Sequence, residues 1–234
     1  MSARLNGQQV RWRALADADA IAHEIALRIA AAAERAIAAR GSFHIVLAGG
    51  ESPRAPYRLL RDAHCDWQRW HVYFGDERCA PREDELRNSR MAALAWLDLV
   101  AIPATQIHVI PGELGADAGA RAYVEVMRGV GEFDLVLLGF GPDGHTASLF
   151  PRHAWGTDEH AADVLAVYDA PFPTAERISL SAARLSRARE VLFMVNGLAK
   201  RQALTDWRAG ADLPVRAITP AAGVDVLCES ALLV

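Results

Sequence analysis

Residues 133–140 read FDLVLLGF, the most strongly apolar of the predicted strands, and they lead into a glycine-rich turn, Gly139–His145. A continuous apolar run of this length is typical of a strand that is buried on both faces, as in a parallel sheet covered by helices. Comparable runs lie at Phe43–Ala48, His71–Gly75 and Glu190–Val195. Helical patterns alternate with these runs, so the sequence predicts an α/β fold with a mainly parallel sheet and helices on both faces.

The other elements follow from apolar spacing and from cap residues, glycines and prolines. Further strands are expected at Ile107–Ile110, Val164–Tyr168 and Arg177–Leu180. Helices are expected at five places: from Ile21 to Ala39 after the cap-type residues Asp17 and Asp19, from Ser52-Pro53 onward, from a capping Asn88 to about Leu97, from Asp117 to about Arg128, and from Leu198 to Ala209. No internal repeat or linker interrupts the pattern, so a single α/β domain over residues 1–234 is predicted.

Composition excludes several classes of function. The net charge of −4 gives no field that attracts nucleic acid or an acidic membrane. The three cysteines (Cys65, Cys79 and Cys228) form no Cys-x-x-Cys motif, which argues against a disulfide framework or a thiolate zinc site and for a reducing compartment. The first twenty residues have no apolar core, so we expect no secretory signal and a cytoplasmic protein.

The chain holds 25 Lys and Arg residues, yet Lys200 is its only lysine. Nucleotide bias in the genome explains a general preference for arginine. Lys200 and Arg201 lie in the first turn of a predicted helix, where the helix dipole disfavours cations by up to about 1 kcal/mol. An anionic ligand would offset that cost, which favours a binding role for Lys200; the alternative is that both side chains extend into water.

Two strand ends carry features of a phosphate site, since ligands of open parallel sheets bind at the carboxyl ends of strands. Gly49 and Gly50 let the backbone approach a ligand, and the N–H groups that follow, including that of Ser52, can bind an anion. Glu51 counts against a phosphate unless its carboxylate points away. In the Gly75-Asp76-Glu77-Arg78 segment, an extended backbone places Asp76 and Arg78 on one face and Glu77 on the other.

The turn Gly139-Phe140-Gly141-Pro142-Asp143-Gly144-His145 formally matches the Gly-x-Gly-x-x-Gly dinucleotide motif. That motif needs a long helix directly after it, whereas Pro151 ends the segment within two turns. What remains is an Asp143/His145 pair at the sheet edge, and histidine suits general acid–base work near neutral pH. The residues alone support an α/β enzyme or binder for a small phosphorylated metabolite.

Four sequence blocks resemble those of the 6-phosphogluconolactonase family, whose members are the second enzyme of the oxidative pentose phosphate pathway. They are LVLLGFGPDGHTASLFP (135–151), FGDERCAP (74–81), LAGGESPRAPY (47–57) and RISLSAARLSRAREVLFMVNGLAK (177–200), and the resemblance spans residues 43–220. The resemblance implies a modified Rossmann-like, doubly wound sheet, no cofactor and no metal. The chain departs from the family pattern at Ala48, Glu51 and Ser52 in the first loop and at Arg87, where a serine is common.

The wider superfamily includes glucosamine-6-phosphate deaminases, which carry a catalytic glutamate five residues after the Asp-Gly-His histidine. Phe150 stands at that position, and Arg78 replaces the tyrosine that follows Asp-Glu in the deaminases. Both differences favour the lactonase over a deaminase or isomerase. A non-catalytic sugar-phosphate sensor is the other alternative, but such proteins normally carry a DNA-binding helix-turn-helix, for which there is no room before Phe43.

The resemblance implies hydrolysis of 6-phospho-D-glucono-1,5-lactone to 6-phospho-D-gluconate. His145 is expected to act as general base on water and then as general acid toward the ring oxygen, with Asp143 either orienting His145 or holding a hydroxyl. Substrate binding is assigned to Gly49, Gly50, Ser52, Asp76, Arg78 and Lys200, and the groups that stabilise the oxyanion stay open. The expected partner is a small phosphorylated sugar lactone, with no nucleic acid or membrane, in a monomer or weak homodimer.

Overall fold

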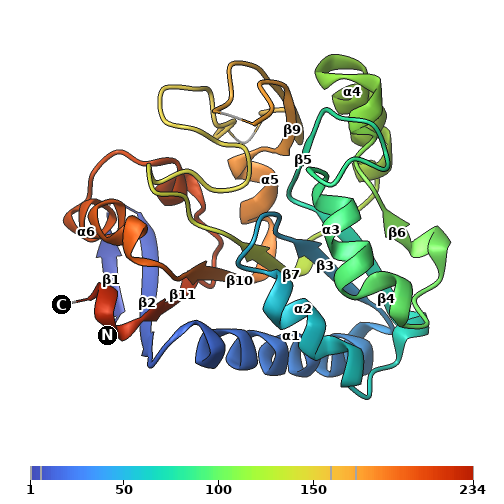
Figure 1. Cartoon of the computed structure of the whole chain (residues 1–234), viewed down its shortest axis with the longest axis horizontal. Helices are drawn as coiled ribbons and strands as arrows, with labels where there is room; N and C mark the ends of the chain where they lie inside the picture. Colours follow the sequence, from blue (N-terminus) through green and yellow to red (C-terminus); the bar gives the residue numbers. More distant parts are fainter. Residues whose placement is uncertain (1, 6, 159, 172, 234) are drawn as a thin grey trace.

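The computed structural model describes residues 2–5, 7–158, 160–171 and 173–233, and its main feature is a mainly parallel sheet (Figure 1). In spatial order its eight strands are β1 (Ser2–Leu5), β2 (Gln8–Leu15), β11 (Val224–Glu229), β10 (Ala188–Val195), β7 (Phe133–Leu138), β3 (Phe43–Leu47), β4 (Trp70–Phe74) and β6 (Ile107–His108). Only the β1–β2 pair is antiparallel. The predicted mainly parallel α/β sheet is confirmed, although β1, β2 and β11 were not predicted from the sequence.

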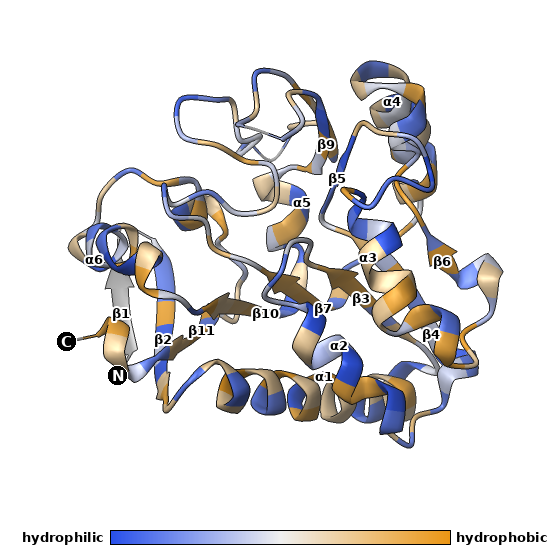
Figure 2. Cartoon of the chain, viewed as in Figure 1, coloured by the Kyte–Doolittle hydropathy of each residue, from blue (hydrophilic) through white to orange (hydrophobic). Residues whose placement is uncertain are grey.

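The core surrounds β7, in which all six residues are buried. Burial of every residue requires cover on both faces of the sheet, which is what its strongly apolar sequence predicts. On one face lies α1 (Ala18–Arg40), whose Ile21, Ile25 and Ile29 are at most 2% exposed. Figure 2 shows the apolar central strands above the mixed surface of this helix. No helix within the described residues is long and apolar enough to span a bilayer.

The helix bounds lie close to the predicted ones. The structure gives α2 (Arg54–Leu59), α3 (Asn88–Ala95), α4 (Ala116–Met127) and α6 (Arg201–Ala209), together with a short α5 (Ala182–Ser186) that was not predicted from the sequence. The prediction that Asn88 caps α3 is wrong: Asn88 is its first helical residue, and its side chain donates to Asp76 instead. The predicted helix from Leu198 begins as a 3-10 turn, Leu198–Lys200, before α6.

A second, antiparallel sheet lies beside the carboxyl edge of the first. It consists of β5 (Asp76–Arg78), β9 (Arg177–Leu180) and β8 (Val164–Val167). The predicted strands at 164–168 and 177–180 therefore exist, but they do not join the parallel sheet as expected. After Gly75 the chain leaves β4 and pairs with β9, so the Asp-Glu-Arg segment becomes the edge that connects the two sheets. Residues of both sheets share one apolar cluster.

Candidate functional site

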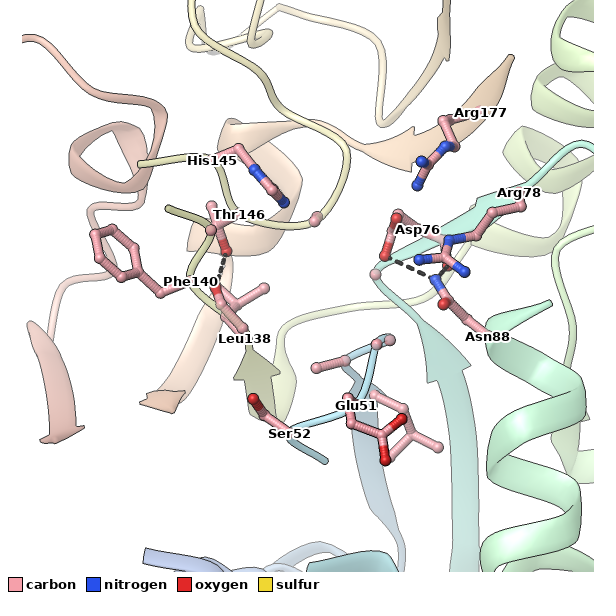
Figure 3. A pocket seen from close by; sticks show the side chains of 18 of the residues that line it. Glu51, Ser52, Asp76, Arg78, Asn88, Leu138, Phe140, His145, Thr146 and Arg177 are labelled. Atoms are coloured by element: carbon pink, nitrogen blue, oxygen red, sulfur yellow. Dashed lines mark hydrogen bonds between the residues drawn. The ribbon is translucent and has the colours of Figure 1, made fainter. Parts of the chain in front are cut away.

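A cavity of about 240 Å³ lies at the carboxyl ends of β3, β4, β7 and β10, with β5 and β9 on one side (Figure 3). The structure brings all but one of the predicted site residues to its lining: Gly49, Gly50, Ser52, Asp76, Arg78, His145 and Lys200. Asp143 stands behind His145 rather than in the lining. Segments separated by up to about 150 residues of sequence thus meet at one edge because parallel strands end on the same side.

His145 and Asp143 form a close pair at the rim. Nδ1 of His145 lies 2.5 Å from Oδ1 of Asp143, which also accepts the His145 backbone N–H. Partial burial raises the pKa of Asp143, but the hydrogen bond and charge of His145 outweigh it, so the pKa lies below its ordinary value. The carboxylate is therefore charged at neutral pH and holds Nδ1, so Nε2 is the ring nitrogen that faces the cavity.

Two neighbours fix the imidazole ring of His145. A Cβ at Gly141 would stand 2.1 Å from Nδ1, so only glycine leaves room for the ring, and the Gly141 N–H donates to the His145 carbonyl oxygen at 2.8 Å. The ring of Phe150 packs 4.8 Å away between centroids. Gly141 therefore serves the packing of His145, whereas Gly144 has a positive φ and packs against Leu213.

The Gly49–Ser52 loop lies opposite this turn. Gly49 is in contact with the Asn88 side chain, which a Cβ would meet at 2.1 Å, so this glycine admits Asn88 as well as a ligand. Glu51 pairs with Arg54 at 2.8 Å and is 86% exposed; Figure 3 shows its carboxylate directed away from His145. That orientation removes the objection that Glu51 would repel a phosphate.

Asp76 and Glu77 point to opposite sides, as the extended backbone predicts. Asp76 accepts hydrogen bonds at the cavity from Asn88 Nδ2 (3.1 Å) and Ser148 Oγ (2.6 Å). Glu77 is fully buried, forms an ion pair with Arg87 at 3.0 Å and accepts the backbone N–H of Asn88 at 2.6 Å. The buried pair thus holds the first turn of α3, and through it Asn88, against the cavity.

The cations behave differently from one another. Lys200 lines the cavity, and burial lowers the pKa of its ammonium while Glu229 partly opposes this. Arg201 turns away and donates to the carbonyl oxygen of Ala231 at 2.8 Å. Arg78 lines the opposite side and donates to the Leu86 carbonyl oxygen. Of the two neighbouring cations singled out from the sequence, only Lys200 can reach a bound ligand.

Sequence reasoning missed three functional candidates: Asn88, Ser148 and Arg177. Asn88 follows the FGDERCAP block that resembles the family, but its predicted role was that of a helix cap, because an asparagine before a helix is usually one. Ser148 lies in the same run as His145 but supports Asp76 from beneath. Arg177 begins an apolar strand, and no local pattern indicates that it faces a cavity formed by residues a hundred positions earlier.

Comparison with known proteins places this geometry in a family. A family model described as "Glucosamine-6-phosphate isomerases/6-phosphogluconolactonase" matches residues 16–227. A 6-phosphogluconolactonase of Mycobacterium leprae is 39% identical over 210 residues, covering 84% of this chain and 83% of that protein. The Mycobacterium tuberculosis 6-phosphogluconolactonase is 38% identical over 221 residues, covering 88% of both chains.

Solved structures show the same fold. The Thermotoga maritima 6-phosphogluconolactonase superposes with a TM-score of 0.87 at 25% identity, covering 94% of this chain and all of that one. A monomeric glucosamine-6-phosphate deaminase superposes with a TM-score of 0.78 at 20% identity, covering 96% and 98%. The second likeness concerns the fold alone, so the choice between the two chemistries depends on the residues at the site.

Proposed function

The chain belongs to the family of glucosamine-6-phosphate isomerases and 6-phosphogluconolactonases, and from that premise we propose that it hydrolyses 6-phospho-D-glucono-1,5-lactone to 6-phospho-D-gluconate. One observation carries the proposed hydrolysis: the Asp143–His145 pair presents the imidazole at the rim of a cavity that also exposes Lys200 and Arg78. A base and a set of cations in one cavity suit water attack on a phosphorylated, electrophilic carbonyl compound.

The reaction proceeds in two steps at His145. Nε2 takes a proton from water as the water oxygen bonds to C1, and the carbonyl electron pair becomes an oxyanion. When the oxyanion collapses, the bond from C1 to the ring oxygen breaks and His145 returns the proton to that oxygen. Asp143 stabilises the imidazolium between these steps, and its place behind the ring favours this role over binding of a sugar hydroxyl.

The phosphate binds on the side of the cavity formed by the Gly49–Ser52 loop. Backbone N–H groups of Gly49, Gly50 and Ser52 and the ammonium of Lys200 surround it. Anchoring the non-reacting phosphate orients the carbonyl before His145, so its binding energy contributes to the rate. Asp76, held by Asn88 and Ser148, receives sugar hydroxyls from the other side.

A pH-stat assay with freshly prepared lactone tests the proposal, because each turnover forms a carboxylic acid that releases a proton. We expect hydrolysis well above the spontaneous rate, and His145→Ala to lower kcat about 10²–10⁴-fold. His23→Ala, which removes an exposed histidine of α1, is the matched control and should leave kcat unchanged. Near-normal turnover by His145→Ala would contradict the mechanism.

A deaminase reaction is the second candidate, and Phe150 argues against it. Its apolar ring packs on His145 at the position where the deaminases carry their glutamate, so no carboxylate acts there. Release of ammonia from glucosamine 6-phosphate would establish this alternative. Binding of the sugar phosphate without turnover of either compound would establish the sensor.

We also propose that the protein works in the cytoplasm as a single-domain monomer or weak homodimer, without nucleic acid or membrane. The cysteines support a reducing compartment, since Cys65, Cys79 and Cys228 are all free thiols and disulfides are typical of oxidising compartments. Light scattering across a concentration series measures the oligomeric state.

A further inference from the structure

Arg177 is a buried cation that the proposed function does not yet use. It is 6% exposed, begins β9 and lines the cavity. Its Nε donates to the Thr174 carbonyl oxygen at 2.8 Å and its Nη2 to that of Pro171 at 3.2 Å. Within the described residues, Nη1 has no hydrogen-bond partner and no carboxylate lies within 4.0 Å of the guanidinium. Two backbone oxygens thus fix the group while one edge stays available.

A second arginine stands directly across from it. In the antiparallel pairing of β5 with β9, Arg78 is opposite Arg177, and both side chains reach the cavity. Like charges at directly opposed positions destabilise a sheet. Burial and the charge of Arg78 lower the pKa of Arg177, whereas Asp76 raises it.

The nearby carboxylates offset this pair only in part: Asp76 attracts Arg177 from a distance, but within the described residues neither arginine forms an ion pair within 4.0 Å. Asp76 is engaged by Asn88 and Ser148, and Glu77 is buried against Arg87. An anion at the cavity edge would relieve the repulsion between Arg78 and Arg177. The arrangement is therefore that of an anion site whose ligand comes from outside the chain.

The position of Arg177 indicates which anion it meets. In Figure 3, Arg177 and His145 both lie on the upper side of the cavity, and Ser52 and Glu51 lie on the lower side. On the proposed function, the phosphate occupies the Ser52 side and the reacting carbon lies beside His145. The charge that appears beside His145 during water attack is the oxyanion at C1.

We infer that Arg177 is a catalytic residue that hydrogen-bonds the C1 oxygen, stabilising the oxyanion and then the carboxylate of the product. This inference rests on the proposed function. Arg177 stays protonated throughout: it donates a hydrogen bond, while His145 alone receives and returns the proton. A buried cation that is already held in place stabilises a transition state most where charge develops.

Two ligands separate this role from phosphate binding. 6-Phosphogluconate carries both the phosphate and the C1 carboxylate, whereas D-glucitol 6-phosphate carries the phosphate alone. For Arg177→Met we expect kcat to fall about 10²–10³-fold and the affinity for 6-phosphogluconate about 10- to 100-fold. The affinity for glucitol 6-phosphate, measured by calorimetry, should change less than twofold. Arg177→Lys should recover part of both losses, because the charge remains.

Lys200→Ala is the comparison variant and should weaken both ligands equally. If Arg177→Met also weakens the binding of both ligands equally, Arg177 belongs to the phosphate site. If it weakens the binding of neither ligand and kcat stays normal, the role of Arg177 is structural. Either result overturns the inference. Retained binding of glucitol 6-phosphate shows that the variant is folded. If Arg177→Met does not fold, Arg177→Lys is used instead: a loss of affinity for 6-phosphogluconate without a loss for glucitol 6-phosphate supports the inference, and equal affinities to the unmodified protein overturn it. Absence of lactone hydrolysis by the unmodified protein refutes the proposed function instead, whatever the two affinities show.

Discussion

Substituting Gly141 by alanine should disable the site without removing any chemical group from it. The added Cβ would stand 2.1 Å from Nδ1, 2.2 Å from Cε1 and 2.7 Å from Cγ of His145. Non-bonded carbon contacts settle at about 3.5–4.0 Å, so the ring must move by more than about 1 Å. Such a shift breaks the 2.5 Å contact of Nδ1 with Asp143. A misplacement of about 1 Å costs about 10²-fold in rate, and we expect that loss in kcat.

The pH-stat assay measures kcat, and calorimetry with glucitol 6-phosphate checks that phosphate binding is unchanged. Gly131→Ala is the matched control, because a Cβ at Gly131 meets no atom within 4 Å. Neither Gly131 nor Gly141 has a positive φ, so alanine strains neither backbone. A Gly141→Ala protein whose kcat stays within twofold of the unmodified protein would refute the view that this glycine positions His145.

Other perturbations test the remaining groups. Lys200→Ala should raise KM about 10-fold or more with a smaller change in kcat, because a charged hydrogen bond to the phosphate is lost in both the ground state and the transition state. Arg201 faces away from the cavity, so Arg201→Ala should change KM less than twofold. Asp143→Asn should lower kcat about 10- to 100-fold, since the hydrogen bond of His145 to a charged carboxylate is lost and such bonds contribute about 1.5–3 kcal/mol. An unchanged kcat would exclude the positioning role of Asp143. Burial lowers the pKa of three histidines with stacked rings on β3, β4 and β6 (His44, His71 and His108). As the pH drops below about 6.5, these histidines bind protons in the unfolded chain before they do in the folded one, so the free energy of unfolding should fall. Urea unfolding at pH 7.5 and pH 5 measures this difference, which should be smaller after substitution of any one of the three by glutamine.

The sequence predicted the elements whose signals are local. Short, strongly apolar runs such as Phe133–Leu138, bounded by turn residues, favour a strand covered on both faces, and glycines or prolines marked the ends of several helices. The strands β1, β2 and β11 were missed. Gln8–Leu15 alternates in hydropathy because its two faces differ in burial, and over a few residues that signal is weaker than a continuous apolar run. The prediction of His145, Lys200 and the Gly49–Ser52 loop as site residues followed from their positions after strands.

By itself the sequence determined the parallel sheet, the edge at which the loops converge and, through its motifs, the family. Only the tertiary structure decided how the second sheet pairs, because the register of β5 with β9 joins segments about 100 residues apart and depends on packing that no local pattern encodes. That register sets Arg177 opposite Arg78. Burial of Glu77 with Arg87 likewise turns Asn88 from an expected helix cap into a cavity residue, since a buried carboxylate must find its partners wherever the fold supplies them.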